Sequence, residues 1–292
     1  MIVTLGDLLE DIVVWPSGPM RTGTDTPATI HRRRGGSAAN VAAAVAHLGR
    51  PARFLGSVGD DEVGARLAKQ LAARGVDVRA HRVADAATGA IVVVVDPDGE
   101  RSFLTDRGAS TWLARVETSW LAGATALHVP AYSFTTEPLA SAAADAVWQV
   151  RAAGGEISID TSSTAVLRDM GPERFLALVA ELEPDVVLAN REEAALLGLD
   201  GHTCCRGAAL TVVRHGSESS VVVTEAGKVV VVDVPPVDVV VDTTGAGDAF
   251  AAGWLVARAE GAEADDAVRR GHEVAQRVLA SPGAEIGEDV SR

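Results

Sequence analysis

Residues 242–250 combine residue types that could bind a phosphate group and move a proton. The segment, Asp-Thr-Thr-Gly-Ala-Gly-Asp-Ala-Phe, follows a valine-rich stretch and leads into an apolar run over 249–259 that predicts a helix. Asp248 therefore lies at a helix N-terminus, where bare backbone N–H groups and the helix dipole attract anions. Gly245 and Gly247 let the backbone approach a ligand closely. An anion site beside a carboxylate base suits phosphoryl transfer to a hydroxyl group.

A simpler interpretation of this segment is a plain turn in which Asp248 only caps the helix. A lone Gly-x-Gly-Asp does not decide between the two. In the phosphoryl-transfer hypothesis the backbone amides of Gly245, Ala246 and Gly247 stabilise the transferring group while Asp248 takes the hydroxyl proton. The hypothesis needs further groups for the acceptor and for the nucleotide.

A second glycine motif is a candidate for holding the acceptor. Gly35 and Gly36 open a predicted helix and Asn40 lies on its first turn. Asp11 follows the first predicted strand, and its carboxylate could accept hydrogen bonds from vicinal hydroxyls. Taken alone, the glycine motif fits an ordinary loop and helix start equally well, and Asp11 fits a solvated turn residue better than a ligand-binding one.

A third motif is a candidate for the metal side of the site. Asn190 and Glu193 belong to the segment Asn-Arg-Glu-Glu, directly after an apolar predicted strand. Mg²⁺ keeps several waters in protein sites, so the two side chains could act on it through water. An Asn cap followed by glutamates is also an ordinary helix start.

Length and composition limit the class of protein. The chain has 292 residues, 47% of them hydrophobic, which fits one large α/β domain or one domain with a small appendage. Its formal net charge of −14 argues against nucleic acid as a partner. The basic cluster 31–34 is interpreted as a solvated loop or strand end.

The cysteines and the apolar segments bear on compartment. Cys204 and Cys205 are adjacent and show no metal spacing, as expected for a reduced, cytoplasmic protein. No signal peptide is visible at the N-terminus. No apolar run approaches the roughly 20 residues of a membrane helix, so no membrane partner is expected.

Strand-length apolar runs alternate with helical patterns along most of the chain. This alternation predicts an α/β fold with a mostly parallel sheet and helices on both faces, and ligands bind such sheets at the carboxyl ends of the strands. We expect strands at 2–5, 52–58, 125–129, 156–160, 185–188 and 210–214, and helices at 38–48, 62–74, 138–153, 172–182, 191–197, 248–259 and 264–280.

Two segments, 12–34 and 88–106, interrupt this alternation with strands that no helix separates. The second contains Pro-Asp-Gly turn chemistry and predicts a hairpin. We expect these segments to form a small antiparallel β lid on an α/β body made of 1–11, 35–87 and 107–292. Lids exclude water and protect a phosphoryl donor from hydrolysis. Another hairpin is expected at 219–232.

These motifs together resemble the PfkB, or ribokinase-like, family of carbohydrate and nucleoside kinases. The string 242–250 resembles the C-terminal signature of that family, and 35–40, continuing through 56–64, resembles the N-terminal one. The resemblance covers nearly the whole chain and implies a ribokinase-like fold. It implies an ATP-dependent kinase in which Asp248 is the base, Asp11 with the 35–40 motif holds the sugar, and Asn190 and Glu193 serve Mg²⁺ and phosphate.

The resemblance also implies a nucleotide pocket and a cation site. His215 and Gly216 stand in the strand-end loop that relatives place beside the nucleotide, and His272 falls where many relatives carry Asn. Some relatives bind a monovalent cation such as K⁺ beside the anion hole, where Asp242 and Thr244 stand here. Many relatives dimerise through their lid sheets, so a homodimer is a further expectation.

The acceptor remains open between ribose, fructose and a nucleoside. Arg107 resembles an arginine of fructokinase and ketodeoxygluconate-kinase relatives that meets an acidic or hydroxylated substrate. Acid-sugar kinases tend to carry another arginine shortly after the central-strand aspartate. Asp160 here is followed by none until Arg168, which weakens that interpretation. Trp15 and Phe103 could stack on a nucleoside base or simply pack the lid.

Other functional classes stay as alternatives. An inactive sugar- or nucleotide-binding regulator on the same fold would not need Asp248, and a vitamin kinase of the wider superfamily would not need the Asp11 and Gly35-Gly36 features. A P-loop ATPase and a dinucleotide enzyme are disfavoured, because the sequence contains no Gly-x-x-x-x-Gly-Lys-Ser/Thr and no Gly-x-Gly-x-x-Gly after the first strand.

Overall fold

The computed structural model describes residues 1–96, 98, 100–237, 240 and 243–279. Two sheets organise this part of the chain, and the larger has the strand order β13-β12-β11-β10-β9-β8-β1-β4-β5. All neighbours from β11 to β5 pair in parallel, and β12 and β13 add an antiparallel edge. Its strands are β1 (Ile2–Leu5), β4 (Ala52–Gly59), β5 (Asp77–Val83), β8 (Ala126–Pro130), β9 (Glu156–Asp160), β10 (Val186–Asn190), β11 (Leu210–His215), β12 (Glu218–Thr224) and β13 (Val229–Val232).

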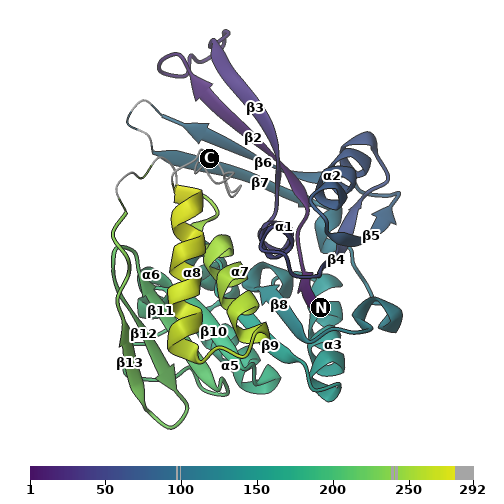
Figure 1. Cartoon of the computed structure of the whole chain (residues 1–292). Coiled ribbons are helices and arrows are strands. Elements are labelled where there is room, and N and C mark those ends of the chain that lie inside the picture. Colours follow the sequence, from purple (N-terminus) through teal and green to yellow (C-terminus); the bar gives the residue numbers. More distant parts are fainter. Residues whose placement is uncertain (97, 99, 238–239, 241–242, 280–292) are drawn as a thin grey trace.

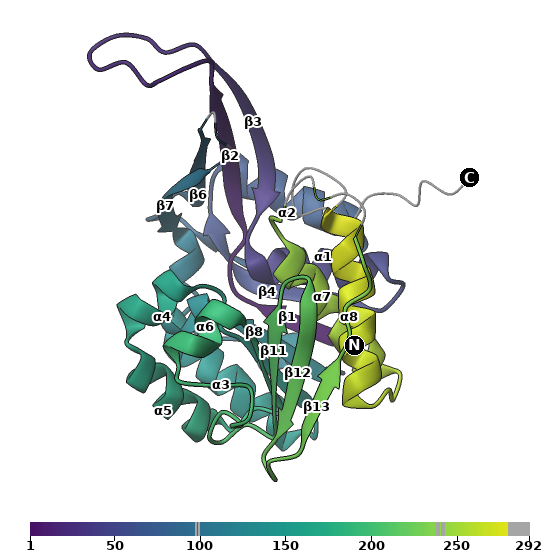
Figure 2. The same ribbon diagram turned by 90° about the vertical axis from the view of Figure 1, so that its left-hand side faces the viewer.

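Helices cover both faces of this sheet, because its central strands are apolar on both sides. Helices α1, α7 and α8 lie on one face and α3 and α5 on the other (Figures 1 and 2). On β1, Ile2 belongs to the core with α1, α7 and α8, whereas Val3 and Leu5 belong to the core with α3 and α5. The predicted α/β fold is therefore confirmed. The helices are α1 (Ser37–His47), α2 (Glu62–Ala73), α3 (Leu139–Ala152), α4 (Thr164–Met170), α5 (Pro172–Leu182), α6 (Arg191–Leu196), α7 (Ala246–Ala259) and α8 (Ala264–Leu279), with 3-10 turns at Ala109–Thr111, Thr118–Leu121 and Ala131–Phe134.

The second sheet projects from the body as a separate layer (Figure 2). Its order is β3-β2-β6-β7, built from β2 (Leu9–Pro16), β3 (Ala28–Gly35), β6 (Thr88–Val95) and β7 (Arg101–Gly108). The β2–β3 and β6–β7 pairs are antiparallel hairpins, and β2 and β6 run parallel between them. We call these four strands the lid sheet. Pro97 and Gly99 of the expected turn lie outside the described residues.

The lid sheet is fixed to the body near its base by a buried carboxylate. Glu10 on β2 accepts hydrogen bonds from Arg32 on β3, at 2.6 Å, and from Arg66 on α2. Its side chain is 4% exposed, so both guanidinium groups approach it in a partly dehydrated setting where charge-assisted bonds are strong. Glu10 is therefore turned away from the sugar-holding position that Asp11 was expected to occupy.

Within the described chain no helix is long and apolar enough to cross a bilayer.

Candidate active site

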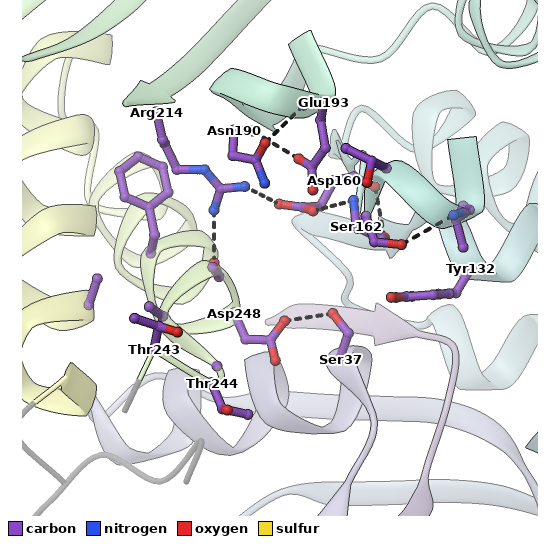
Figure 3. A pocket seen from close by; sticks show the side chains of 18 of the residues that line it. Ser37, Tyr132, Asp160, Ser162, Asn190, Glu193, Arg214, Thr243, Thr244 and Asp248 are labelled. Carbon is purple, nitrogen blue, oxygen red and sulfur yellow. Dashed lines mark hydrogen bonds and ion pairs between the residues drawn. The ribbon is translucent and has the colours of Figure 1, made fainter. Parts of the chain in front are cut away.

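A cavity of about 1470 Å³ separates the lid sheet from the carboxyl ends of the parallel strands. The lid lines it with alternate residues of β2, namely Leu9, Asp11, Val13 and Trp15, because side chains at every second position share one face of a strand. The body contributes strand-end loops and the start of α7 (Figure 3). The cavity thus occupies the edge of the sheet where the alternating pattern predicts a ligand.

Asp248 lies on the first turn of α7 and faces this cavity (Figure 3). Gly245 precedes the helix with a φ of 77°, a left-handed conformation that suits glycine. Ser37 Oγ donates to Asp248 Oδ1 at 2.6 Å, and Asn40 Nδ2 donates to Oδ2 at 2.9 Å. Two donors from α1 therefore hold the carboxylate in one orientation, more than a simple helix cap requires.

The surroundings of Asp248 raise the pKa of its carboxyl toward neutral pH. Burial raises the pKa of Asp248 to about 6, against the lowering effect of the bonds from Ser37 and Asn40. A carboxylate with such a pKa is ionised at pH 7 and can still accept a proton readily. Of the three expected amides, the N–H of Ala246 already donates to the Thr243 carbonyl at 3.2 Å and is used in the turn.

Asp11 and the 35–40 motif meet across the base of the lid sheet. A Cβ on Gly35 would lie 2.3 Å from Asp11 Oδ1, and one on Gly36, whose φ is 102°, would lie 2.2 Å from the Asp7 carbonyl oxygen. Glycine is therefore required at position 36, whereas a side chain at position 35 would have to displace the Asp11 carboxylate. Arg34 Nη1 donates to Asn40 Oδ1 at 2.9 Å. Burial raises the pKa of Asp11 to about 6, and the positive charge of Arg34 opposes that rise.

The basic cluster 31–34 was interpreted as a solvated loop or strand end, and the expectation that it is solvated is wrong for Arg33 and Arg34. The cluster does belong to strand β3, but Arg33 and Arg34 are half-buried and line the cavity. Arg33 is the cross-strand partner of Asp11. Sequence alone could not show this, because the facing of a strand is fixed by its pairing register.

Arg107 sits at the end of β7 against a buried carboxylate and an aromatic ring. Its Nη2 donates to both oxygens of Asp7 at 2.5 Å, and its guanidinium carbon lies 5.0 Å from the centroid of the Tyr132 ring. Asp7, on the loop after β1, is 8% exposed in its side chain and Arg107 is 18% exposed. Salt bridge and cation–π contact together fix the guanidinium at the edge of the cavity.

Arg214 was missed as a site residue, although it ends the predicted strand 210–214. It joins three parts of the site: its guanidinium donates to Asp160 Oδ2 at 3.1 Å and to the Gly247 carbonyl at 3.3 Å. It also lies over the Phe250 ring, 5.2 Å from the centroid (Figure 3). A fixed positive charge thus stands beside the start of α7, where phosphate oxygens would gather.

Asn190 and Glu193 form a reciprocal capping box at the start of α6. The Glu193 N–H donates to Asn190 Oδ1 at 2.9 Å, and the Asn190 N–H donates to Glu193 Oε2 at 2.8 Å. Thr161 Oγ1 also donates to Glu193 Oε2, at 2.5 Å. Burial and the nearby Asp160 carboxylate raise the pKa of Glu193. The two residues therefore do form an ordinary helix start. Both side-chain bonds of Glu193 go to Oε2, and its Oε1 has no hydrogen bond in the described chain.

The residues expected at the nucleotide end line the same cavity. His215 Nδ1 contacts the Ser219 carbonyl at 2.9 Å, and Gly216 follows with a φ of 66°. His272 is buried: it is 6% exposed, its Nε2 lies 2.8 Å from Ser220 Oγ, and its ring packs edge-on against Phe250. Burial lowers the pKa of His272 to about 4, so it is neutral at pH 7.

Thr244, expected beside the anion hole, accepts a hydrogen bond from Arg101 at the tip of β7. The lid sheet therefore reaches the loop that leads into α7. Asp242, the other residue expected at a cation site, lies outside the described residues. Among those that are described, no three His, Cys, Asp or Glu side chains converge as a ready metal site.

Several lining residues were absent from the sequence prediction, and most follow a strand of the large sheet. Tyr132 comes two residues after β8, and Ser162 and Ser163 follow β9. Ser37 lies between the glycines and Asn40 of a motif already singled out. Ligands bind such sheets at the carboxyl ends of the strands, so Tyr132, Ser162 and Ser163 could have been suspected, but this rule does not say which residues after a strand face the cavity.

Comparison with known proteins shows similarity to kinases in both sequence and structure. The sequence profile described as pfkB family carbohydrate kinase matches residues 1–290. An ATP-dependent ribose-1-phosphate kinase of Halopiger xanaduensis is 37% identical over 239 residues, which are 79% of this chain and 76% of that protein.

Two solved structures resemble the fold over almost its whole length. The adenosine kinase of Sinorhizobium meliloti has a TM-score of 0.86 and 28% identity, covering 97% of this chain and 95% of its own. A protein described as ribokinase II from E. coli, in complex with ATP and Mg²⁺, has a TM-score of 0.81 and 26% identity, covering 97% and 94%.

Proposed function

The chain belongs to the pfkB family of carbohydrate kinases, and from that premise we propose that it transfers the γ-phosphoryl group of ATP to a primary hydroxyl of a small sugar or nucleoside. One observation supports this most directly. The Asp248 carboxylate is held by Ser37 and Asn40 at the N-terminus of α7, in a cavity that also contains Asp11. Such a transfer needs a base, a helix end that binds anions, and a group that accepts hydrogen bonds from the hydroxyls of the substrate.

In this proposal Asp248 accepts or orients the proton of the attacking hydroxyl. Its pKa of about 6 keeps it ionised at neutral pH. The amides of Gly245 and Gly247, with the dipole of α7, stabilise the negative charge of the transferring group. Arg214 adds a positive charge beside Gly247. Asp11, Asn40 and the closely approaching backbone at Gly35 and Gly36 hold the hydroxyls of the acceptor.

The chemistry of the strand-end carboxylates fits Mg²⁺ held partly through water. Asp160 and Glu193 line the cavity close enough for the charge of one to raise the pKa of the other. Bound Mg²⁺ would neutralise nucleotide phosphate charge in the space that these carboxylates face. Thr161 and Asn190 keep Glu193 oriented toward that space through their bonds to Oε2.

We place the nucleotide between the β11–β12 turn and α8. His215, Gly216 and the apolar segment 234–237 line one side, and His272 and Gln276 line the other. Apolar walls with a few fixed polar groups are typical of sites for nucleobases.

Two acceptor classes remain candidates. A sugar is favoured by the carboxylate and amide groups at the base of the lid. A nucleoside is favoured by Trp15 and Phe103, which face the cavity from the lid and are 37% and 60% exposed. Such aromatic surface could stack on a base. The names of two similar proteins reflect the same choice, one acting on ribose-1-phosphate and the other on adenosine.

A coupled assay of ADP formation over a panel of sugars and nucleosides tests the proposal. We expect Mg²⁺-dependent turnover with at least one member and none without an acceptor. Tight binding of an acceptor with no turnover on any panel member would instead show a regulator on a kinase fold.

Three finer points belong to the same proposal. Thr244 and Asp242 would bind a monovalent cation, tested by comparing activity in K⁺ and in tetramethylammonium salts. The outer face of the lid exposes Ile30 and Leu104, by 58% and 64%, and would pair two copies, tested by light scattering. The proposed use of ATP and the two free cysteines, Cys204 and Cys205, fit a cytoplasmic location, which cell fractionation would test.

A further inference from the structure

We propose that Gln276 makes the protein select adenine nucleotides, by accepting a hydrogen bond from the 6-amino group of the base. This inference rests on the proposed kinase function and on the placement of the nucleotide between the β11–β12 turn and α8. It starts from a side-chain amide on α8 whose orientation is fixed by its bond to a distant segment of the chain.

Gln276 lies on the last turn of α8 and lines the cavity. Its Nε2 donates to the Pro235 carbonyl at 2.6 Å, across 41 positions of the chain. Proline has no backbone N–H, and a carbonyl oxygen can only accept, so the nitrogen of the amide must be the atom that faces Pro235. The other end of the amide, Oε1, is therefore held in the role of a hydrogen-bond acceptor.

Oε1 of Gln276 has no donor of its own in the described part of the chain. The side chain is half-buried, and apolar residues line the cavity around it, namely Val234, Val237 and Leu279. A polar atom that loses water in such surroundings and gains no hydrogen bond is costly. The oxygen therefore favours a ligand that brings an N–H group to it.

The nearest polar neighbour on α8 lacks this fixed role. His272 lies one turn earlier on the same helix face, and its Nε2 is 2.8 Å from Ser220 Oγ. A serine hydroxyl can donate or accept, so this contact leaves both tautomers of the neutral imidazole open. His272 can thus adapt to different bases, whereas Gln276 discriminates between them.

The purine bases differ in what they offer to a fixed acceptor. The 6-amino group is the only N–H donor of the adenine base in a nucleotide, whereas guanine and hypoxanthine carry an oxygen at that position. Adenine therefore satisfies Oε1, and the other two bases would place one oxygen against another. Rejection by an unsatisfied polar group is an effective basis of specificity.

Nucleotide binding by the whole protein tests the inference without a known acceptor. We would measure Kd for ADP, IDP and GDP by isothermal titration calorimetry in the presence of Mg²⁺. ADP and IDP are a matched pair, with an amine in one and an oxygen in the other at the same ring carbon. We expect ADP to bind about 10- to 100-fold more tightly than IDP, since IDP leaves the acceptor unsatisfied.

A variant locates the effect. Gln276→Leu keeps a side chain of similar size without polar atoms, so it should bind ADP and IDP about equally. Any shift of the segment 234–237 on losing the bond to Pro235 would weaken both nucleotides alike, so the ratio of the two Kd values is the readout. Gln70→Leu, the same change at an exposed position of α2, is the matched control and should keep the wild-type ratio.

The outcomes separate the inference from the function on which it rests. ADP bound no more tightly than IDP or GDP would overturn the role of Gln276 and leave the kinase proposal standing, as would a preference for ADP that persists in Gln276→Leu. Binding of none of the three nucleotides, together with no ADP formation in the coupled assay, would overturn the kinase function and the inference with it.

Discussion

Ser37 and Asp248 stand 211 positions apart in the chain and are joined by a 2.6 Å hydrogen bond at the floor of the cavity. The bond connects the start of α1, which follows the lid strand β3, with the start of α7. The two signature segments of the sequence therefore meet at one carboxylate. In the proposed mechanism, this bond positions the base relative to the hydroxyl that it deprotonates, because Ser37 is next to the glycines proposed to hold the acceptor.

Replacing Asp248 with Asn should lower kcat by about 10²- to 10⁴-fold, the usual contribution of a positioned general base. The amide retains the shape and can still bond to Ser37 and Asn40, so KM for ATP and for the acceptor should change little. Steady-state kinetics on both substrates measure this. Asp145→Asn, at an exposed position of α3, is the control. Near wild-type turnover in Asp248→Asn would rule out its role as base.

Activity should fall on the acid side of pH 6. Burial raises the pKa of both Asp248 and Asp11 to about 6, and each must be ionised, one to accept a proton and the other to accept hydroxyl bonds. Below that pH, log kcat/KM should decline with a slope of about 1 for one required carboxylate or about 2 for both. A profile recorded from pH 4.5 to 8 checks this. A flat profile down to pH 5 would contradict the assignment of these groups.

The same Asp248→Asn variant should be more stable than wild type at neutral pH. The pKa of Asp248 is higher in the folded state than its ordinary value of 3.8, so between these values the folded state binds more protons than the unfolded state. The free energy of unfolding therefore decreases as pH rises through this window, and the penalty is fully present above pH 6. Asn does not titrate and removes it.

Thermal unfolding at two pH values measures that gain. At pH 7.5 Asp248→Asn should have the higher Tm, by on the order of 2–4 °C for each kcal/mol recovered. The gap should narrow as the pH falls from 6 to 4 and should close below pH 3.8, where both states of the wild-type protein bind the proton. Asp145→Asn should show no such pH-dependent gap. A variant less stable than wild type at both pH values would contradict the burial argument.

Gly35→Ala should weaken acceptor binding without affecting ATP. The new Cβ would lie 2.3 Å from Asp11 Oδ1 and must displace that carboxylate. We expect KM for the acceptor to rise about 10-fold, the order expected for losing a charged hydrogen bond, with KM for ATP unchanged. A double-mutant cycle with Asp11→Ala tests the cause, because Gly35→Ala should add little once the carboxylate is gone. Additive losses would refute this mechanism.

Arg214→Lys should lower kcat although it preserves the charge. Lysine lacks the planar fork that lets Arg214 bond to Asp160 and to the Gly247 carbonyl together. We expect a loss of about 10-fold, with a larger loss in Arg214→Met, in line with charge-assisted hydrogen bonds of this kind. Arg269→Lys, on the exposed face of α8, is the control. Unchanged kinetics in Arg214→Lys would show that charge alone suffices there.

Much of the fold followed from local patterns. The predicted strands 2–5 and 156–160 coincide with β1 and β9, and the predicted helix 172–182 coincides with α5. Their apolar periodicity is strong because they are buried. β5 was missed because this edge strand, Asp-Val-Arg-Ala-His-Arg-Val, is mostly polar. α4 was missed because seven residues are too few to show a helical period.

For the site, the sequence supplied the residue types and the structure supplied their partners. Asp248, Asp11 and the 35–40 motif were named from spacing and resemblance, and the structure places them at one cavity. The pairs Asp7–Arg107 and Asp160–Arg214 were not foreseen. Each joins loops or strands that are distant in the chain, and only the assembled sheets bring them within 3.1 Å.

The sequence by itself determined the α/β alternation, the helix that begins beside Asp248 and the family of kinases to which the chain belongs. These depend on neighbours in the chain, through side-chain periodicity, capping and glycine conformation. The tertiary structure decided which charges meet, because strand order and register set which side chains face the cavity. The string around Asp248 could indicate phosphoryl transfer. Only the folded lid brings Asp11 to the same cavity as Asp248.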